Sequence, residues 1–99
     1  MRSYKFTPLA ERQLRDADDW WQIHRTAAPN AVLDDTESTI AMLLPEPAIG
    51  PLARDVELPD VRRVVMERIR YYLYYRFDDV TVEILALWHT SRGSPPLLQ

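Results

Sequence analysis

His89 and Arg92 are the residues near the C-terminus whose side chains could act on a phosphate. A histidine can accept or donate a proton near neutral pH, and an arginine can stabilise the negative charge that develops on a phosphate during transfer. The pair therefore fits phosphodiester cleavage, with His89 as the proton acceptor and Arg92 as the cation. The alternative interpretation is structural, with His89 at the solvent-exposed end of a strand and Arg92 in a flexible tail.

Other titratable residues are explained more simply by structure. His24 continues the apolar stripe of a predicted helix, where we expect a histidine packed at the edge of the core. The carboxylates at Asp16, Asp18 and Asp19 predict the solvated face of the same helix. Because the chain has two histidines and no cysteine, no metal site is indicated, and we expect no cofactor.

A β-hairpin is predicted for residues 69–89, where apolar and polar residues alternate. We expect a two-residue turn at Asp78-Asp79, which pairs residue 77 with 80, 75 with 82, 73 with 84, 71 with 86 and 69 with 88. This register makes one face apolar and places Leu73 and Ile84 in the core. The opposite face, the arginine–tyrosine face, carries Arg70, Tyr72, Tyr74, Arg76, Leu85 and Leu87.

The arginine–tyrosine face has three interpretations. Its tyrosine and arginine planes could stack on bases and neutralise nucleic acid. They could equally bind an acidic, amphipathic protein segment, since Tyr and Arg dominate interface hot spots. The face could also be an ordinary solvated surface. Leu85 and Leu87 favour a protein partner.

The elements that position these residues are predicted from local patterns. Residues 3–6 fit a strand, and Thr7-Pro8 fits a helix start, because threonine can cap and proline suits the first helical position. One helix extends to about residue 24, and a second from about residue 29 to residue 44. The predicted buried stripes are Ala10, Leu14, Ala17, Trp20/Trp21 and His24 in the first helix, and Leu33, Thr36, Ile40 and Leu43/Leu44 in the second.

The two adjacent tryptophans cannot both face the core squarely, so we expect Trp20 or Trp21 at the edge of the helical pair or in a partner contact. Residues 45–60 contain four prolines and predict an irregular crossing loop. In the predicted strand at residues 61–66, either alternation points Arg62 or Arg63 inward, so we expect a bulge or a loop adjustment there.

The predicted order is strand–helix–helix–strand–strand–strand. This order indicates an α+β fold with an N-terminal strand and an antiparallel helical hairpin packed on an antiparallel β-sheet. We expect a single domain over residues 1–99, in which residues 90–99 form a flexible tail, because Pro95 and Pro96 remove two backbone donors.

Composition narrows the function. The 99 residues are 46% hydrophobic with a net charge of −3 and only one lysine, Lys5. Residues 8–44 carry three arginines against seven acidic residues, and residues 61–77 carry five arginines against one glutamate. This balance argues against a generic nucleic-acid binder, although the second segment could form a local anion-binding surface. No apolar run approaches a membrane span, and we expect a cytoplasmic protein.

Several short segments occur in a characteristic order: an aromatic-x-Pro-x-Ala opening at residues 6–10, a leucine–proline helix end at 43–47, Gly50, a basic strand at 61–64, an arginine–tyrosine strand before an acidic turn at 70–79, and His89 followed by Arg92. In this order they resemble the ParE/RelE superfamily, the toxins of bacterial type II toxin–antitoxin modules. The resemblance extends over nearly the whole chain.

The resemblance implies one of two mechanisms. RelE-like members cut mRNA on the ribosome with charged and aromatic groups of the sheet, whereas ParE-like members poison DNA gyrase and lack that catalytic set. Here the arginine of the RelE strand motif is replaced by Tyr72, and one lysine in an acidic chain does not favour docking on ribosomal RNA. We therefore expect a ParE-like binding toxin without catalytic residues and without direct nucleic-acid binding.

The expected partners follow from this hypothesis. A cognate antitoxin would bind the arginine–tyrosine face in a hetero-oligomer, and gyrase would contact His89 and Arg92. The alternative is a RelE-like mRNA endonuclease that uses His89 and Arg92 in catalysis. A third reading is a non-toxic relic that serves only as a binding module.

Overall fold

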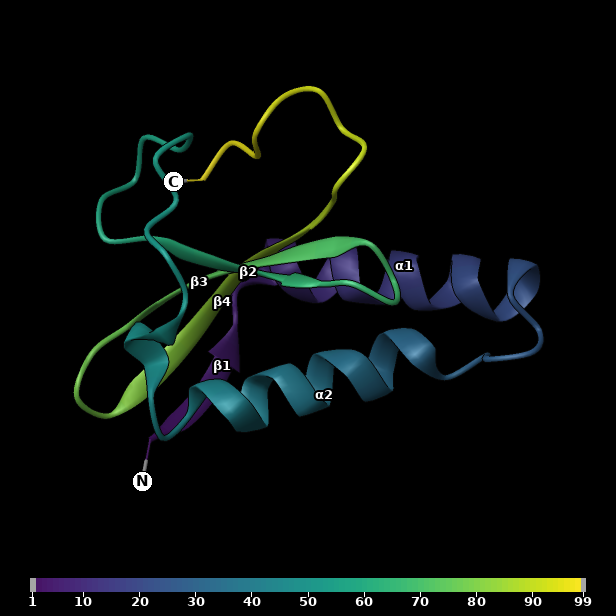
Figure 1. The fold of residues 1–99 in the computed structure, drawn as a ribbon, viewed down its shortest axis with the longest axis horizontal. Coiled ribbons are helices and arrows are strands. Elements are labelled where there is room, and N and C mark those ends of the chain that lie inside the picture. The colour runs from purple at the N-terminus through teal and green to yellow at the C-terminus, as the bar shows by residue number, and fades with distance from the viewer. Residues whose placement is uncertain (1, 99) are drawn as a thin grey trace.

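The computed structural model describes residues 2–98. Two helices pack on one face of a four-stranded sheet with the strand order β1-β4-β3-β2 (Figure 1). The elements are β1 (Ser3–Phe6), α1 (Pro8–His24), α2 (Ala31–Leu43), the 3₁₀ helix η1 (Pro47–Ile49), β2 (Arg62–Met66), β3 (Tyr71–Phe77) and β4 (Thr81–His89). The predicted α+β fold and its element order are confirmed.

The sheet is mixed rather than wholly antiparallel. β1 runs parallel to β4, whereas β2, β3 and β4 pair antiparallel. The short turns between β2, β3 and β4 require antiparallel neighbours. β1 is joined to the sheet through the two helices, so no turn determines its direction.

The start of α1 agrees with the local sequence signals, whereas the start of α2 differs from the prediction. The Thr7 hydroxyl accepts a hydrogen bond from the N–H of Ala10 at 3.1 Å, and Pro8 occupies the first helical position. α2 begins at Ala31, two residues after the predicted start at Pro29. Its buried face includes Val32 rather than Leu33, which is 42% exposed, so the prediction for Leu33 is wrong.

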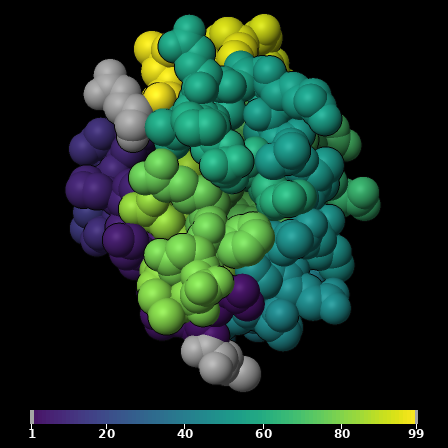
Figure 2. All heavy atoms as spheres, turned by 90° about the vertical axis from the view of Figure 1, so that its left-hand side faces the viewer, coloured from purple at the N-terminus to yellow at the C-terminus, as the bar shows by residue number. Residues whose placement is uncertain are grey.

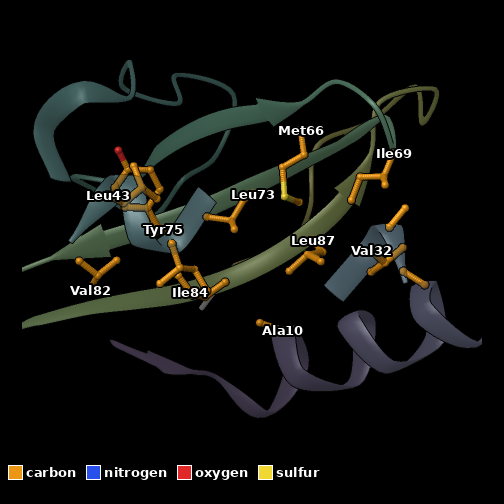
Figure 3. Close-up of a cluster of buried hydrophobic side chains, with 13 residues drawn as sticks. Ala10, Val32, Leu43, Met66, Ile69, Leu73, Tyr75, Val82, Ile84 and Leu87 are labelled. Carbon is orange, nitrogen blue, oxygen red and sulfur yellow. The ribbon is translucent and has the colours of Figure 1, made fainter. Parts of the chain in front are cut away.

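The main core lies between the helices and the sheet (Figure 3). The small residues Ala10 and Ala17 let α1 approach β4 closely, as the apolar stripe predicts. Leu73 and Ile84 are both fully buried, which confirms their predicted burial. The side chains that fill this core include Val32, Ile40, Leu43, Met66, Ile69, Leu73, Tyr75, Val82, Ile84 and Leu87.

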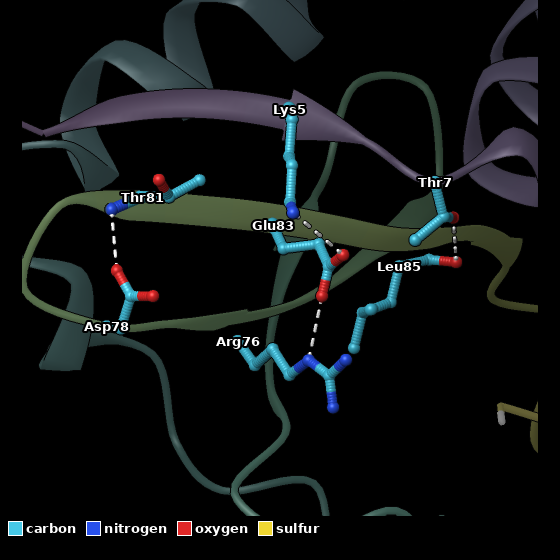
Figure 4. A network of polar contacts seen from close by, with 7 residues as sticks. All are labelled: Lys5, Thr7, Arg76, Asp78, Thr81, Glu83 and Leu85. Carbon is cyan, nitrogen blue, oxygen red and sulfur yellow. Dashed lines mark hydrogen bonds and ion pairs between the residues drawn. The ribbon is translucent and has the colours of Figure 1, made fainter.

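The predicted hairpin register is wrong. Residue 77 pairs with 82 and residue 75 with 84, so the turn lies further along the chain than Asp78-Asp79. The reason is the Asp78 side chain, whose Oδ1 accepts hydrogen bonds from the N–H of Val80 at 2.9 Å and from the N–H of Thr81 at 2.8 Å. Figure 4 shows the bond to Thr81. This side-chain turn places Val80 in solvent, where it is 66% exposed.

A β-bulge then changes the faces of β4. The register shifts at Leu85, between the pairs 75–84 and 74–86, and from there residue 73 pairs with 87 and 72 with 88. Ala86 and Trp88 consequently join the face of Tyr72 and Tyr74, opposite to the prediction. Leu87 turns into the main core, so its assignment to the arginine–tyrosine face is also wrong.

The junction between β1 and α1 holds this bulge in place. The N–H of Thr7 donates to the carbonyl of Ile84 at 3.0 Å, and its hydroxyl donates to the carbonyl of Leu85 at 3.3 Å (Figure 4). Further along β4, the N–H of Leu87 donates to the Gln13 side chain of α1 at 2.9 Å. One threonine therefore caps the helix and binds the irregular part of the strand.

β2 pairs with β3 in a regular register without a bulge. Both of its arginines have contacts on the side of the sheet that each one faces. Arg62 faces the helical side and donates to the carbonyls of Ala48 at 3.2 Å and Gly50 at 2.6 Å. Arg63 faces the other side and contacts Tyr72 and Tyr74. The expected adjustment is thus made by the loop before the strand, which brings carbonyl oxygens to Arg62.

Candidate interaction site

The arginine–tyrosine face is covered by the protein itself. Tyr74 and Leu85 are 1% and 4% exposed, and they form a second core with Val61 and Ala86. Residues 51–61 and the C-terminal segment lie side by side over this face (Figures 1 and 2). The side chains that pack there are Ala53, Val56, Leu58, Tyr72, Trp88 and Leu98.

Arg63 connects residues 51–61, the covering loop, to the sheet. Its guanidinium lies 4.2 Å from the Tyr72 ring centroid and donates to Asp55 Oδ2 at 3.1 Å and to the Tyr74 hydroxyl at 3.2 Å. Burial raises the pKa of Tyr74. The hydrogen bond from Arg63 to the Tyr74 hydroxyl raises the pKa of Arg63. The Tyr74 hydroxyl therefore stays protonated, accepts from Arg63 and donates to Asp55 Oδ2 at 3.4 Å.

The remaining residues of the predicted antitoxin surface are separated from one another. Arg76 donates to Glu83 Oε1 at 2.8 Å, and Lys5 lies 3.7 Å from the other oxygen of the same carboxylate (Figure 4). Arg70 lies beyond the opposite end of β3, in the turn that follows β2, and has a left-handed backbone with φ of 61°. With Tyr74, Leu85 and Leu87 buried, the six residues do not form one open surface.

His89 and Arg92 lie close together at the end of the sheet where β3 begins and β4 ends. They line a pocket of about 340 Å³, the sheet-end pocket, between the end of α1 and the ends of β3 and β4. Tyr71 is the cross-strand neighbour of His89. The predicted register paired residue 71 with residue 86, so it did not place Tyr71 near His89. The full lining is Trp20, Trp21, Ile69, Tyr71, His89, Ser91 and Arg92.

Hydrogen bonds orient the His89 ring in this pocket. Its Nδ1 accepts the N–H of Ser91 at 3.1 Å and lies 2.7 Å from the Ser91 hydroxyl. In the neutral ring the proton is therefore on Nε2. The Tyr71 ring packs edge-on against His89 with centroids 5.1 Å apart, and burial raises the pKa of Tyr71 against the opposing effect of Arg92. Tyr71 and His89 thus both offer hydrogen-bond donors.

The tryptophans of α1 form the opposite wall. Trp21 packs against the main core, whereas Trp20 is 45% exposed, as expected for one of the two. The Trp20 ring stacks on His24 at 4.5 Å, and the Arg25 guanidinium lies 5.0 Å from it. His24 is exposed rather than packed at the edge of the core, so that prediction is wrong: its ring is held against Trp20 on the outside of the helix.

The C-terminal segment returns to the sheet. The Trp88 indole N–H donates to the carbonyl of Ser94 at 2.8 Å, and Arg92 lies 4.1 Å above the Trp88 ring. Pro96 is buried and Leu98 joins the second core. Residues 90–98 are therefore in contact with the domain, Gln99 lies outside the described residues, and the flexibility of this segment stays a prediction.

A second open site lies between β1 and the helices. This apolar groove, the helix–strand groove, has a volume of about 440 Å³ and is bordered by the edge strand β1. No sequence pattern predicts this groove, because its residues come from separate elements of the chain. They are Tyr4, Phe6, Leu14, Leu33, Thr36, Glu37, Ile40, Ala41 and Leu44.

No cluster of histidine or carboxylate side chains within residues 2–98 could hold a metal ion. None of the described helices combines the length and the apolar character needed to cross a bilayer.

A family model described as the ParE toxin of the type II toxin–antitoxin system parDE matches residues 4–93. The chain belongs to the ParE toxin family. This confirms the ParE/RelE resemblance and its ParE-like branch.

A solved structure has the same fold as this ParE family member. A chain described as the chromosomal ParDE TA system from P. aeruginosa superposes with a TM-score of 0.63 at 22% identity, covering 92% of this chain and 98% of that one. No match was found among curated proteins.

Proposed function

We propose that this ParE family member acts by binding: it inhibits DNA gyrase and is neutralised by a cognate antitoxin. The observation that carries the proposal is the covered arginine–tyrosine face. Tyr74 and Leu85 lie under residues 51–61 and the C-terminal segment, so the centre of this face is not open to an mRNA strand. Gyrase contact is assigned to His89 and Arg92, whose sheet-end pocket is open.

The competing function, an mRNA endonuclease, is tested with the same purified protein. Gyrase supercoiling of relaxed plasmid should be inhibited, and mRNA on translating ribosomes should remain intact. Arg92→Ala should lower gyrase inhibition, while Arg54→Ala, which changes an exposed arginine of the covering loop, is the matched control. Codon-specific cuts in translated mRNA that disappear in His89→Ala or Arg92→Ala would instead establish the nuclease.

For the antitoxin, we propose the helix–strand groove rather than the arginine–tyrosine face. The groove is apolar, and Tyr4 and Leu33 expose 52% and 42% of their surface there. Beside it, the outer edge of β1 carries backbone groups that are not paired with another described strand. An antitoxin segment that folds on binding could fill the groove with apolar side chains and add a strand to this edge.

Isothermal titration with the cognate antitoxin compares the two surfaces directly. Leu33→Arg and Ala41→Arg should weaken the complex by about tenfold or more, because each puts a charge into the apolar groove. Leu97→Arg, at an 89% exposed leucine, is the control. If Arg70→Glu/Arg76→Glu weakens the complex while Leu33→Arg does not, the exposed part of the arginine–tyrosine face carries the contact.

A further inference from the structure

The sheet-end pocket combines flat aromatic walls with hydrogen-bond donors. Tyr71, His89 and the two tryptophans of α1 supply the walls. The Tyr71 hydroxyl, the Nε2–H of neutral His89 and the Arg92 guanidinium are donors. Such a set favours a planar ligand that carries an anionic or oxygen-rich group.

Three arginines near the sheet-end pocket form no ion pair within the described residues. Arg15, Arg63, Arg68 and Arg76 each form an ion pair elsewhere in the chain. Within residues 2–98, in contrast, no ion pair involves Arg92 or the neighbouring Arg25 and Arg70, which are exposed. Exposed guanidinium groups beside aromatic rings suit phosphate binding through bidentate hydrogen bonds.

The backbone between two residues of the pocket lining, Ile69 and Tyr71, is also unusual. Arg70 adopts a left-handed conformation with φ of 61°, which is unfavourable for a residue with a Cβ atom. Its carbonyl accepts the N–H of Thr90 at 2.9 Å, which ties this turn to the segment that carries His89 and Arg92. Strained residues of this kind concentrate at ligand sites.

We propose that the sheet-end pocket binds a nucleoside monophosphate. The base packs between the aromatic walls from α1 and the β3–β4 end, and the phosphate contacts Arg92 and His89. The ligand is a single free nucleotide rather than a unit in a strand. Asp16 and Asp19 are exposed on α1, the helix that also supplies Trp20 and Trp21, so further phosphates that extend from the pocket along this helix would be repelled. This proposal does not depend on gyrase being the target.

The test is calorimetric titration of the isolated full chain with guanosine 5′-monophosphate, followed by guanosine, inorganic phosphate and an oligothymidylate octamer. We expect the nucleotide to bind with a dissociation constant in the micromolar to millimolar range, about tenfold or more tightly than guanosine or phosphate alone. The octamer should bind more weakly than the nucleotide at equal salt. Quenching of tryptophan fluorescence provides a second readout, since Trp20 and Trp21 line the pocket.

Variants locate the site. Arg92→Gln and His89→Gln should each weaken nucleotide binding by about tenfold, the loss expected for a charge-assisted contact to phosphate. Arg54→Gln, at an exposed arginine far along the chain, should leave binding unchanged. Circular dichroism confirms that each variant is folded.

Three results would overturn the assignment: no binding of the nucleotide at millimolar concentration, equal loss in Arg92→Gln and Arg54→Gln, or phosphate alone binding as tightly as the nucleotide. Tighter binding of the octamer would overturn the assignment to a free nucleotide.

Discussion

Gly50 is a position where a single methyl group should matter. The buried Tyr75 hydroxyl accepts the N–H of Gly50 at 3.1 Å and donates to the carbonyl of Pro47 at 2.6 Å. A Cβ atom at Gly50 would overlap this hydroxyl. We predict that Gly50→Ala lowers the free energy of unfolding by about 1–3 kcal/mol in urea denaturation. Gly93→Ala, where a Cβ atom has open space, should have little effect and is the control.

A double-mutant cycle tests this cause. Tyr75→Phe alone should be destabilising, by about 1–3 kcal/mol, because it leaves the buried N–H of Gly50 unpaired. In the Tyr75→Phe background the hydroxyl is absent, so adding Gly50→Ala should cost clearly less than in the native protein. Part of the cost should remain, since Val64 Cγ1 lies 3.0 Å from the same Cβ position. Strict additivity would show that the overlap with the hydroxyl is not the cause.

Asp78 predicts a pH dependence of stability. The Asp78 carboxylate accepts hydrogen bonds from the backbone N–H groups of Val80 and Thr81, and these bonds lower the pKa of Asp78 below its ordinary value. Its contribution to stability is therefore complete above the ordinary pKa, about 4, and is lost as the pH falls through the lower folded-state value. The difference in unfolding free energy between native protein and Asp78→Asn should shrink below about pH 4.

Urea denaturation at a series of pH values measures this difference. Asp79→Asn is the control, because the neighbouring carboxylate receives neither of the two turn hydrogen bonds. An equal pH-dependent loss in both variants would contradict the assignment to Asp78.

At the scale of elements, Thr7 links α1 to the bulge of β4. Thr7→Val keeps the shape of the side chain but removes the cap of Ala10 and the donor to Leu85. We predict a loss of about 0.5–2 kcal/mol, with faster hydrogen exchange at the Ala10 amide. Thr26→Val, in the exposed connection between the helices, is the matched control and should change neither quantity. Unchanged exchange at Ala10 would contradict the capping role.

The two faces of β3 should differ in their sensitivity to substitution. Leu73 is fully buried in the main core, so Leu73→Ala should cost about 2–5 kcal/mol in a denaturation measurement. Tyr72 is partly exposed, and its ring mainly supports the Arg63 guanidinium, so Tyr72→Ala should cost much less. Equal losses would mean that residues 51–61 are held to the sheet as tightly as the helices are.

At the scale of the whole molecule, the C-terminal segment has two separable roles. Deletion of residues 90–99 should abolish growth inhibition, because Arg92 is lost, while antitoxin binding in the helix–strand groove is kept. Deletion of residues 94–99 retains Arg92 but removes Pro96, Leu98 and the acceptor of the Trp88 indole N–H. We predict that this shorter deletion lowers stability by about 1–3 kcal/mol and leaves part of the growth inhibition.

Growth assays and thermal unfolding of both truncated proteins distinguish these roles. If the shorter deletion abolishes growth inhibition as completely as the longer one, the contact cannot be assigned to Arg92.

The sequence by itself determined the elements and their order. The cap at Thr7, the helical spacing of Ala10 and Ala17, and the alternation in residues 71–77 are local signals, and each led to the observed helix or strand. The sequence also identified His89 and Arg92 as candidates, because the ability of histidine and arginine to act on a phosphate follows from the residue type alone. The family resemblance came from the order of these same short segments, and the family match over residues 4–93 agrees with it.

Only the tertiary structure decided which faces of β4 are buried and what covers them. Residues 84–88 are all apolar, so their pattern is compatible with either face, and the bulge at Leu85 depends on Thr7, which lies far away in sequence. The apolar residues of the covering loop, such as Val56 and Leu58, have no regular spacing that would reveal their partners. The sheet-end pocket likewise joins residues from α1, β3 and the C-terminal segment, and such contacts form only when packing brings distant elements together.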